Sequence, residues 1–109
     1  MRKIPEWFQI FAKKYPGVMK AYENFAGECH QSGPLSARDR ALVKLGIAAG
    51  SHAEGSVNSQ VRKALDLGMQ PDEIRHAIIL AATAIGFPKM MASLNWAENI
   101  LKDEKTEKI

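Results

Sequence analysis

The sequence predicts an all-α protein of about six helices joined by short loops. Apolar residues recur at spacings of three and four along nearly every segment, which is the period of an amphipathic helix. Proline and glycine separate these segments, and no segment shows the strict alternation of apolar and polar residues that is typical of a half-buried strand. With 109 residues, 46% of them hydrophobic and 25% charged, the chain is expected to form a single domain over residues 1–109.

Two helices are expected before Gly33, and the pair Pro16-Gly17 separates them. The first can include Pro5 in its first turn, where the fixed φ of proline is tolerated. Each helix carries large apolar residues at helical spacing. These residues are Trp7, Phe8, Ile10, Phe11, Met19, Tyr22 and Phe25.

The third and fourth helices are expected on either side of Gly50. The segment SARD predicts the start of the third helix, because Ser36 and Asp39 are spaced as in a capping box. The fourth lies in the stretch GSHAEGSVNSQVRKAL, and Gly68 is a typical residue to end it. Helical geometry predicts that this helix buries one arc. The arc consists of Ala53, Val57, Val61, Ala64 and Leu65.

The fifth helix is expected to begin near Pro71 and to continue to Ile85. Its segment AIILAATAIGF is apolar nearly all round, and so small a domain cannot easily cover such a helix from within one chain. We therefore expect a homo-oligomer that buries the second face of this helix. A sixth, amphipathic helix is expected after Gly86-Phe87-Pro88 and extends to Leu101.

Composition excludes several classes of partner. The formal net charge is only +3, and no block of like charges occurs, so no nucleic-acid partner is expected. No apolar run approaches the roughly 20 residues of a membrane span, and the N-terminal apolar stretch is too short for a signal peptide. The single cysteine, Cys29, excludes an intramolecular disulfide and a CxxC motif. We expect a cytoplasmic protein without membrane contact.

Two motifs carry a resemblance to a known family. They lie in SARDRALVKLGIAAG and in VRKALDLGMQPDEIRHAIILAATAIGFPKMMASLNWAENIL, which follows the pattern V-R-x-A-L-x-x-G, x-P-x-E-I-x-x-x-I and G-F-P. In these segments the chain resembles the carboxymuconolactone decarboxylase family, which includes the alkylhydroperoxidase D-like proteins. The resemblance implies an all-helical fold, assembly as trimers or hexamers, and sites near subunit boundaries.

The redox branch of this family carries C-x-x-C-x-x-x-H just before the V-R pair. The resemblance places these three positions on Ala53, Ser56 and Gln60. Reduction of a peroxide needs two thiols that close a disulfide and a histidine that moves the proton. Peroxiredoxin-type activity is therefore not expected. The decarboxylase branch has a histidine just before V-R, and Gln60 occupies that position too.

Glu54 is the strongest candidate for a catalytic residue. Desolvation at the edge of an apolar arc can raise the pKa of a carboxyl group towards the range of a general base. The alternative is a carboxylate stabilised by the helix dipole or paired with Lys44 or Arg62. His52 is a second catalytic candidate, or an exposed residue of the first turn. The substrate-binding candidates are Ser56, Asn58, Gln60 and Arg62.

Other titratable residues support no site by themselves. His76 borders the apolar stripe of the fifth helix and is interpreted as an edge histidine. His52 and His76 lack the spacing of metal ligands on one helix, so neither a metal nor a cofactor is expected. Cys29 and His30 are adjacent and cannot easily point at one another on a helix, which argues against nucleophilic catalysis there.

Three functions remain compatible with the sequence. The first is a lyase of the carboxymuconolactone decarboxylase kind, in which Glu54 acts as the base on a small organic acid or lactone and Arg62 or Lys44 binds the carboxylate of the substrate. The second is a non-catalytic oligomer that serves as a binding or scaffold protein. The third is a residual redox role of Cys29.

Overall fold

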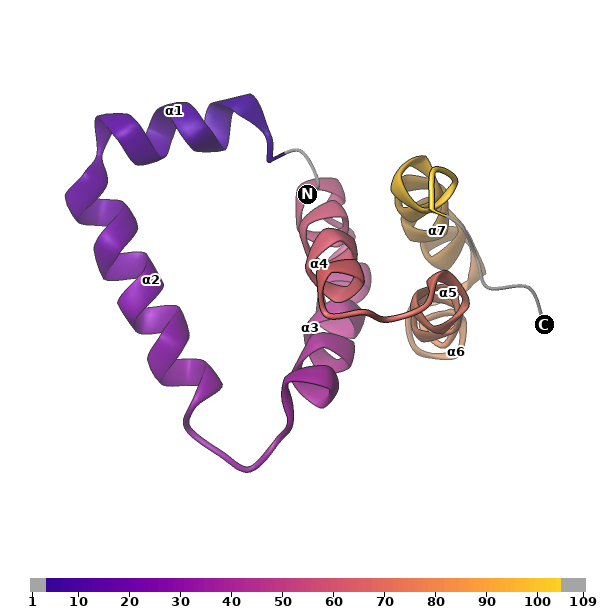
Figure 1. Cartoon of the computed structure of the whole chain (residues 1–109). Helices are drawn as coiled ribbons and strands as arrows, with labels where there is room; N and C mark the ends of the chain where they lie inside the picture. The colour runs from indigo at the N-terminus through magenta and orange to yellow at the C-terminus, as the bar shows by residue number, and fades with distance from the viewer. Residues whose placement is uncertain (1–3, 105–109) are drawn as a thin grey trace. The chain divides into compact units, whose positions relative to one another are not determined.

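The chain is all-helical, as predicted. The computed structural model describes residues 4–104, and within this range it contains helices and no strand (Figure 1). The helices are α1 (Glu6–Lys14), α2 (Pro16–His30), α3 (Ala37–Ser51), α4 (Glu54–Asp66), α5 (Pro71–Ile79), α6 (Ala82–Ile85) and α7 (Phe87–Leu101). They form two compact units, Met1–Pro34 and Leu35–Ile109. The expectation of one domain over residues 1–109 stays a prediction.

The first unit consists of α1 and α2, which contact each other. Pro16 begins α2, because a proline at the first helical position loses no helical hydrogen bond. The rings of Phe11 and Tyr15 lie with their centroids 5.2 Å apart at the junction. Neither helix contains a buried residue. The two helices therefore have a large apolar surface that they do not cover for each other.

The second unit, α3 to α7, contains the hydrophobic core. Its largest fully buried apolar side chains are contributed by every helix of the unit except the four-residue α6. They are Leu45, Val57, Val61, Ile74, Ile78 and Leu101. Val57, Val61, Ala64 and Leu65 are buried on α4, which confirms most of the predicted arc, whereas Ala53 is half-buried and precedes the helix.

Polar groups fix the starts of α3 and α5. The side chain of Ser36 accepts a hydrogen bond from the backbone N–H of Asp39 (3.1 Å), as the SARD motif predicts. At α5, the carboxylate of Glu73 accepts from the backbone N–H of Gln70 (2.9 Å). This second contact satisfies an N–H group that the helix itself leaves without a partner.

The fifth predicted helix is interrupted. Helix α5 ends at Ile79, and α6 begins at Ala82, so that seven helices occur in residues 4–104 where about six were expected. At the break, the backbone N–H of Ala81 donates to the carbonyl of Ile78 (2.9 Å), which is the tighter bonding of a 3₁₀ turn. Gly86, with φ of 100°, then ends α6 and precedes α7.

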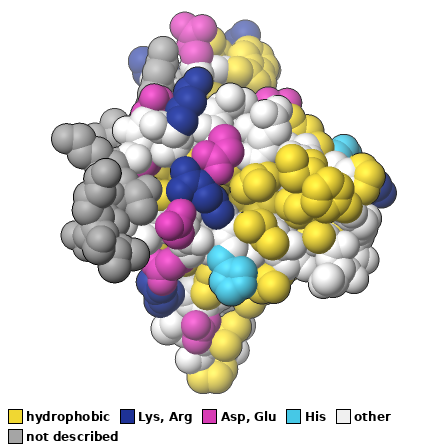
Figure 2. All heavy atoms as spheres, turned by 90° about the vertical axis from the view of Figure 1, so that its right-hand side faces the viewer, with side chains coloured by type: hydrophobic (Ala, Val, Ile, Leu, Met, Phe, Trp, Pro, Cys, Tyr) yellow, Lys and Arg dark blue, Asp and Glu magenta, His cyan; other side chains and the backbone are white. Residues whose placement is uncertain are grey.

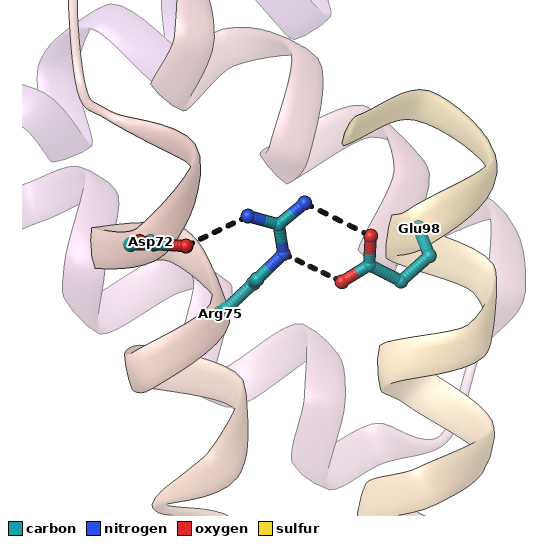
Figure 3. Close-up of polar contacts among 3 residues, drawn as sticks. All are labelled: Asp72, Arg75 and Glu98. Atoms are coloured by element: carbon teal, nitrogen blue, oxygen red, sulfur yellow. Dashed lines mark hydrogen bonds and ion pairs between the residues drawn. The ribbon is translucent and has the colours of Figure 1, made fainter. Parts of the chain in front are cut away.

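An ion pair joins α5 to α7 (Figure 3). Arg75 donates from Nε to Oε2 of Glu98 (2.6 Å) and from Nη2 to Oε1 (3.0 Å), and its Nη1 donates to Oδ1 of Asp72 (2.7 Å). The hydrogen bonds to Glu98, and then those to Asp72, raise the pKa of Arg75 above its usual value. The guanidinium therefore stays charged and holds the two helices in a fixed orientation.

No helix in the described range has the length and apolar character needed to cross a bilayer. The expected cytoplasmic location stays a prediction.

Candidate functional site

The two candidate catalytic residues lie where α3 ends and α4 begins. His52 ends α3 with φ of 55°, a left-handed conformation that residues other than glycine rarely adopt. Its ring lies against that of Trp96 on α7, with centroids 5.1 Å apart and planes inclined by 49°. The imidazole therefore lies between α7 and the start of α4.

Glu54 is the first residue of α4 and is exposed. Its carboxylate lies in the first turn of the helix, where the dipole favours negative charge. Glu54 forms no ion pair with any residue between positions 4 and 104. The described residues therefore show no pairing of Glu54 with Lys44 or Arg62, and the role of Glu54 stays a prediction.

The substrate-binding candidates lie on two sides of α4. Ser56 is exposed, and Asn58, Gln60 and Arg62 are half-buried. The Oδ1 atom of Asn58 is buried and accepts no hydrogen bond from the described part of the chain.

A pocket of about 520 Å³ lies between α3, α5 and α6, away from these residues. Small and aliphatic residues form most of its wall, and three charged or titratable side chains, Arg38, Glu73 and His76, complete it. The apolar wall consists of Leu42, Gly46, Gly50, Ala77, Leu80, Ala81, Ala84 and Ile85. None of the six residues predicted as a site lines this pocket.

Sequence reasoning did not predict this pocket. Arg38 and Glu73 form an ion pair between α3 and α5, although they are far apart in the chain. His76 was interpreted as an edge histidine, and it lies on the pocket wall. One signal was present in the sequence, since Gly46 and Gly50 on α3 share the four-residue spacing of Ala77 and Ala81.

Other candidate chemistry is dispersed in the structure. In residues 4–104, no three His, Cys, Asp or Glu side chains are grouped so as to hold a metal ion. Cys29 is a free, exposed thiol on α2.

A comparison with protein families shows to which family the chain belongs. The sequence model of the carboxymuconolactone decarboxylase family matches residues 16–99, from the start of α2 into α7. The chain belongs to this family. A search of curated proteins finds no match. The resemblance predicted from the sequence motifs is thus confirmed, and the single cysteine agrees with a member that lacks the CxxC motif.

In this member of the carboxymuconolactone decarboxylase family, the three positions that the resemblance assigns to the redox motif lie at the start of α4. Ala53 precedes the helix, Ser56 lies in its first turn and Gln60 lies one turn further. A thiol in this first turn would be activated by the helix dipole. Alanine and serine occupy the two positions, so neither position carries a thiol.

Proposed function

We propose that this carboxymuconolactone decarboxylase family member is an oligomeric binding protein that does not reduce peroxides. Copies of the chain assemble through apolar surfaces, in the trimers or hexamers that the resemblance implies, and the assembly binds a small molecule. One observation carries the proposal: the helices α1 and α2 bury no side chain, although they carry most of the aromatic residues of the chain.

The size of the first unit supports assembly. Units below about 40 residues usually need disulfides, metals or a partner surface in order to fold. Met1–Pro34 is shorter than this, and its cysteine is free. Trp7 and Phe25 are 70% and 68% exposed. Exposure of aromatic side chains to this extent is typical of an interface before its partner is added.

The second unit has an exposed apolar surface of its own. Figure 2 shows hydrophobic side chains gathered in a patch beside interspersed charged groups on the side of the molecule that α5, α6 and α7 occupy in Figure 1. The large hydrophobic side chains exposed on these three helices and on the turn between α5 and α6 are Ile79, Leu80, Phe87 and Met91. Two apolar surfaces on one chain allow copies to pair and the assembly to close.

Light scattering during size-exclusion chromatography tests the proposal. We expect a mass of three or six times the 12.1 kDa of the chain. Phe25→Glu places a charge in the surface of α2 and is expected to reduce the mass. Asn24→Glu is the matched control, because it adds the same charge at a neighbouring exposed position of the same helix. A folded wild-type protein with the mass of a single chain contradicts the proposal.

A second candidate function is acid/base chemistry at the α3–α4 link. The observation in its favour is the left-handed conformation of His52, since backbone strain of this kind is frequent at functional sites. Here Glu54 would act as the base, with His52 as proton donor and Ser56, Asn58, Gln60 or Arg62 orienting a small organic acid or lactone. The reaction would be that of a lyase.

Release of CO₂ from carboxymuconolactone tests this second function. Glu54→Gln is expected to abolish turnover, while Glu6→Gln, an exposed first-turn carboxylate on α1, leaves turnover unchanged. Wild-type protein that releases no CO₂, or equal rates for wild type and Glu54→Gln, contradicts the acid/base hypothesis.

A further inference from the structure

The pocket between α3, α5 and α6 has the size and the composition of a ligand site. Small-molecule pockets typically enclose about 300–1,000 Å³ and combine apolar walls with a few polar groups. The pocket measures about 520 Å³, and its walls are aliphatic except at Arg38, Glu73 and His76. Every lining residue belongs to the second compact unit.

The polar groups lie at one end of the pocket. Arg38 is in the first turn of α3 and pairs with Glu73 in the first turn of α5, and His76 follows Glu73 by one turn. Gly50 is near the other end of α3, about 18 Å from Arg38 at 1.5 Å per residue. The pocket is therefore elongated, with charged groups at the Arg38 end and an apolar wall beyond it.

The charged end can accept an anionic group. A guanidinium has five N–H donors, and the ion pair with Glu73 uses the Nη2 side of Arg38. The remaining donors of Arg38 and a ring nitrogen of His76 can bind a carboxylate. The negative charge of Glu73 opposes a second negative charge, which disfavours a phosphate dianion and favours a monoanion.

The apolar part suits a narrow hydrocarbon chain. Gly46 and Gly50 on α3 face the pocket, opposite small residues such as Ala77 and Ala81. A Cβ atom placed on Gly46 or on Gly50 meets no atom within 4 Å. The glycines thus leave open space along the wall, in which a ligand displaces water from apolar surface.

We propose that this pocket binds an unbranched aliphatic monocarboxylate of medium length. Its carboxylate contacts Arg38 and His76, and its hydrocarbon chain lies along Gly46 and Ala81. This inference names the ligand class of the binding function proposed above and rests on it.

Isothermal titration calorimetry on the full chain tests the inference with three probes. Octanoate is expected to bind saturably, with one molecule per chain. Octanol keeps the hydrocarbon chain without the charge, and acetate keeps the charge without the hydrocarbon chain, so both are expected to bind at least tenfold more weakly. Arg38→Gln is expected to weaken octanoate at least tenfold and to leave octanol unchanged.

A pair of glycine variants locates the site. Gly46→Leu fills the pocket without a clash of its Cβ atom and is expected to weaken octanoate at least tenfold. Gly55→Leu is the matched control, because Gly55 is also helical and open but lies on α4 outside the pocket. Urea unfolding of both variants, monitored by circular dichroism, verifies that each is folded.

The outcomes separate this inference from the proposed function. If octanoate does not bind, or binds equally to wild type and Gly46→Leu, the inference is wrong whatever the mass of the assembly. If octanoate does not bind and Gly46→Leu lowers the mass of the oligomer, the pocket is an interface between copies. This result overturns the inference and supports the proposed assembly. A monomer that binds octanoate at Gly46 contradicts the assembly alone.

Discussion

Arg75 on α5 and Glu98 on α7 form a two-point ion pair, in which Nε and Nη2 each donate to a different carboxylate oxygen of Glu98 at 2.6 and 3.0 Å. The side chain of Arg75 is only 27% exposed. The planar guanidinium matches the carboxylate in a way that the single ammonium of lysine cannot. The contact therefore fixes the orientation of two helices that form part of the core.

Arg75→Lys is expected to destabilise the protein by about 1 kcal/mol, because it removes one of the parallel hydrogen bonds and partial exposure limits the value of the pair. Urea unfolding at one protein concentration measures the change. Arg62→Lys is the control, since Arg62 forms no ion pair within residues 4–104. Equal losses in both variants contradict a specific role of Arg75.

The pH dependence of this contribution follows from the raised pKa of Arg75. A basic group whose pKa is higher in the folded state adds stability below its unfolded pKa and loses it as pH rises through the folded pKa. The Arg75 contribution is thus expected to be lost only above the usual pKa of arginine. Unfolding of wild type and Arg75→Lys at neutral and mildly alkaline pH is expected to give the same difference in stability.

Substitution by alanine is expected to change the stability of the protein in opposite directions at two glycines. Gly46 is helical and a Cβ atom there has open space, so Gly46→Ala is expected to stabilise the protein by about 0.5–1 kcal/mol. Gly68 has φ of 91° and follows Leu67, the C-cap of α4; here the N–H of Met69 donates to the carbonyl of Ala64 and that of Gly68 to the carbonyl of Leu65. Gly68→Ala is expected to cost about 1–2 kcal/mol. Thermal unfolding distinguishes the two signs, and two changes of the same sign would contradict the argument.

The sequence predicted the helices best where one residue determines the local backbone. Ser36 and Pro71 lie at or next to the first residue of their helices, and Val57 and Val61 are buried as the helical period requires. The break after Ile79 was not predicted, because residues 72–85 contain neither proline nor glycine. The packing of the helices against one another determines such a break, and the spacing of apolar residues in the sequence does not indicate it.

The candidate site was harder to predict for the same physical reason. The two charged residues of the pocket, Arg38 and Glu73, meet through the packing of α3 on α5, which is a contact between distant parts of the sequence. The left-handed backbone at His52 was not predicted either, because glycine, and not histidine, is the usual residue there.

His52 is expected to tolerate asparagine better than alanine. Asparagine adopts left-handed backbone more readily than most residues, so His52→Asn is expected to lose less stability than His52→Ala. Both variants remove the ring contact with Trp96. In a Trp7→Phe background, where Trp96 is the remaining tryptophan of the chain, both are expected to shift its fluorescence to longer wavelength. Unchanged emission contradicts a stable ring contact.

The start of α4 is expected to show thiol chemistry when two cysteines are introduced there. Wild-type protein and Cys29→Ser are both expected to leave added peroxide unconsumed. Ala53→Cys combined with Ser56→Cys places two thiols at a helix N-terminus, where the pKa of a thiol is lowered. Mass spectrometry after mild oxidation is expected to show a disulfide between positions 53 and 56. Peroxide consumption by wild type that disappears in Cys29→Ser contradicts the proposed function.

Neighbouring isoleucines on α5 distinguish the core from the proposed interface. Ile78 is fully buried and Ile79 is 46% exposed. Ile78→Ala is expected to cost about 2–5 kcal/mol, because it leaves a cavity in the core. Ile79→Ala is expected to change the stability of a single chain little. If a second copy covers α5, however, Ile79→Ala removes apolar contact between copies, and the mass measured by light scattering falls at low protein concentration. An unchanged mass for Ile79→Ala across a dilution series shows that this part of α5 lies outside the interface.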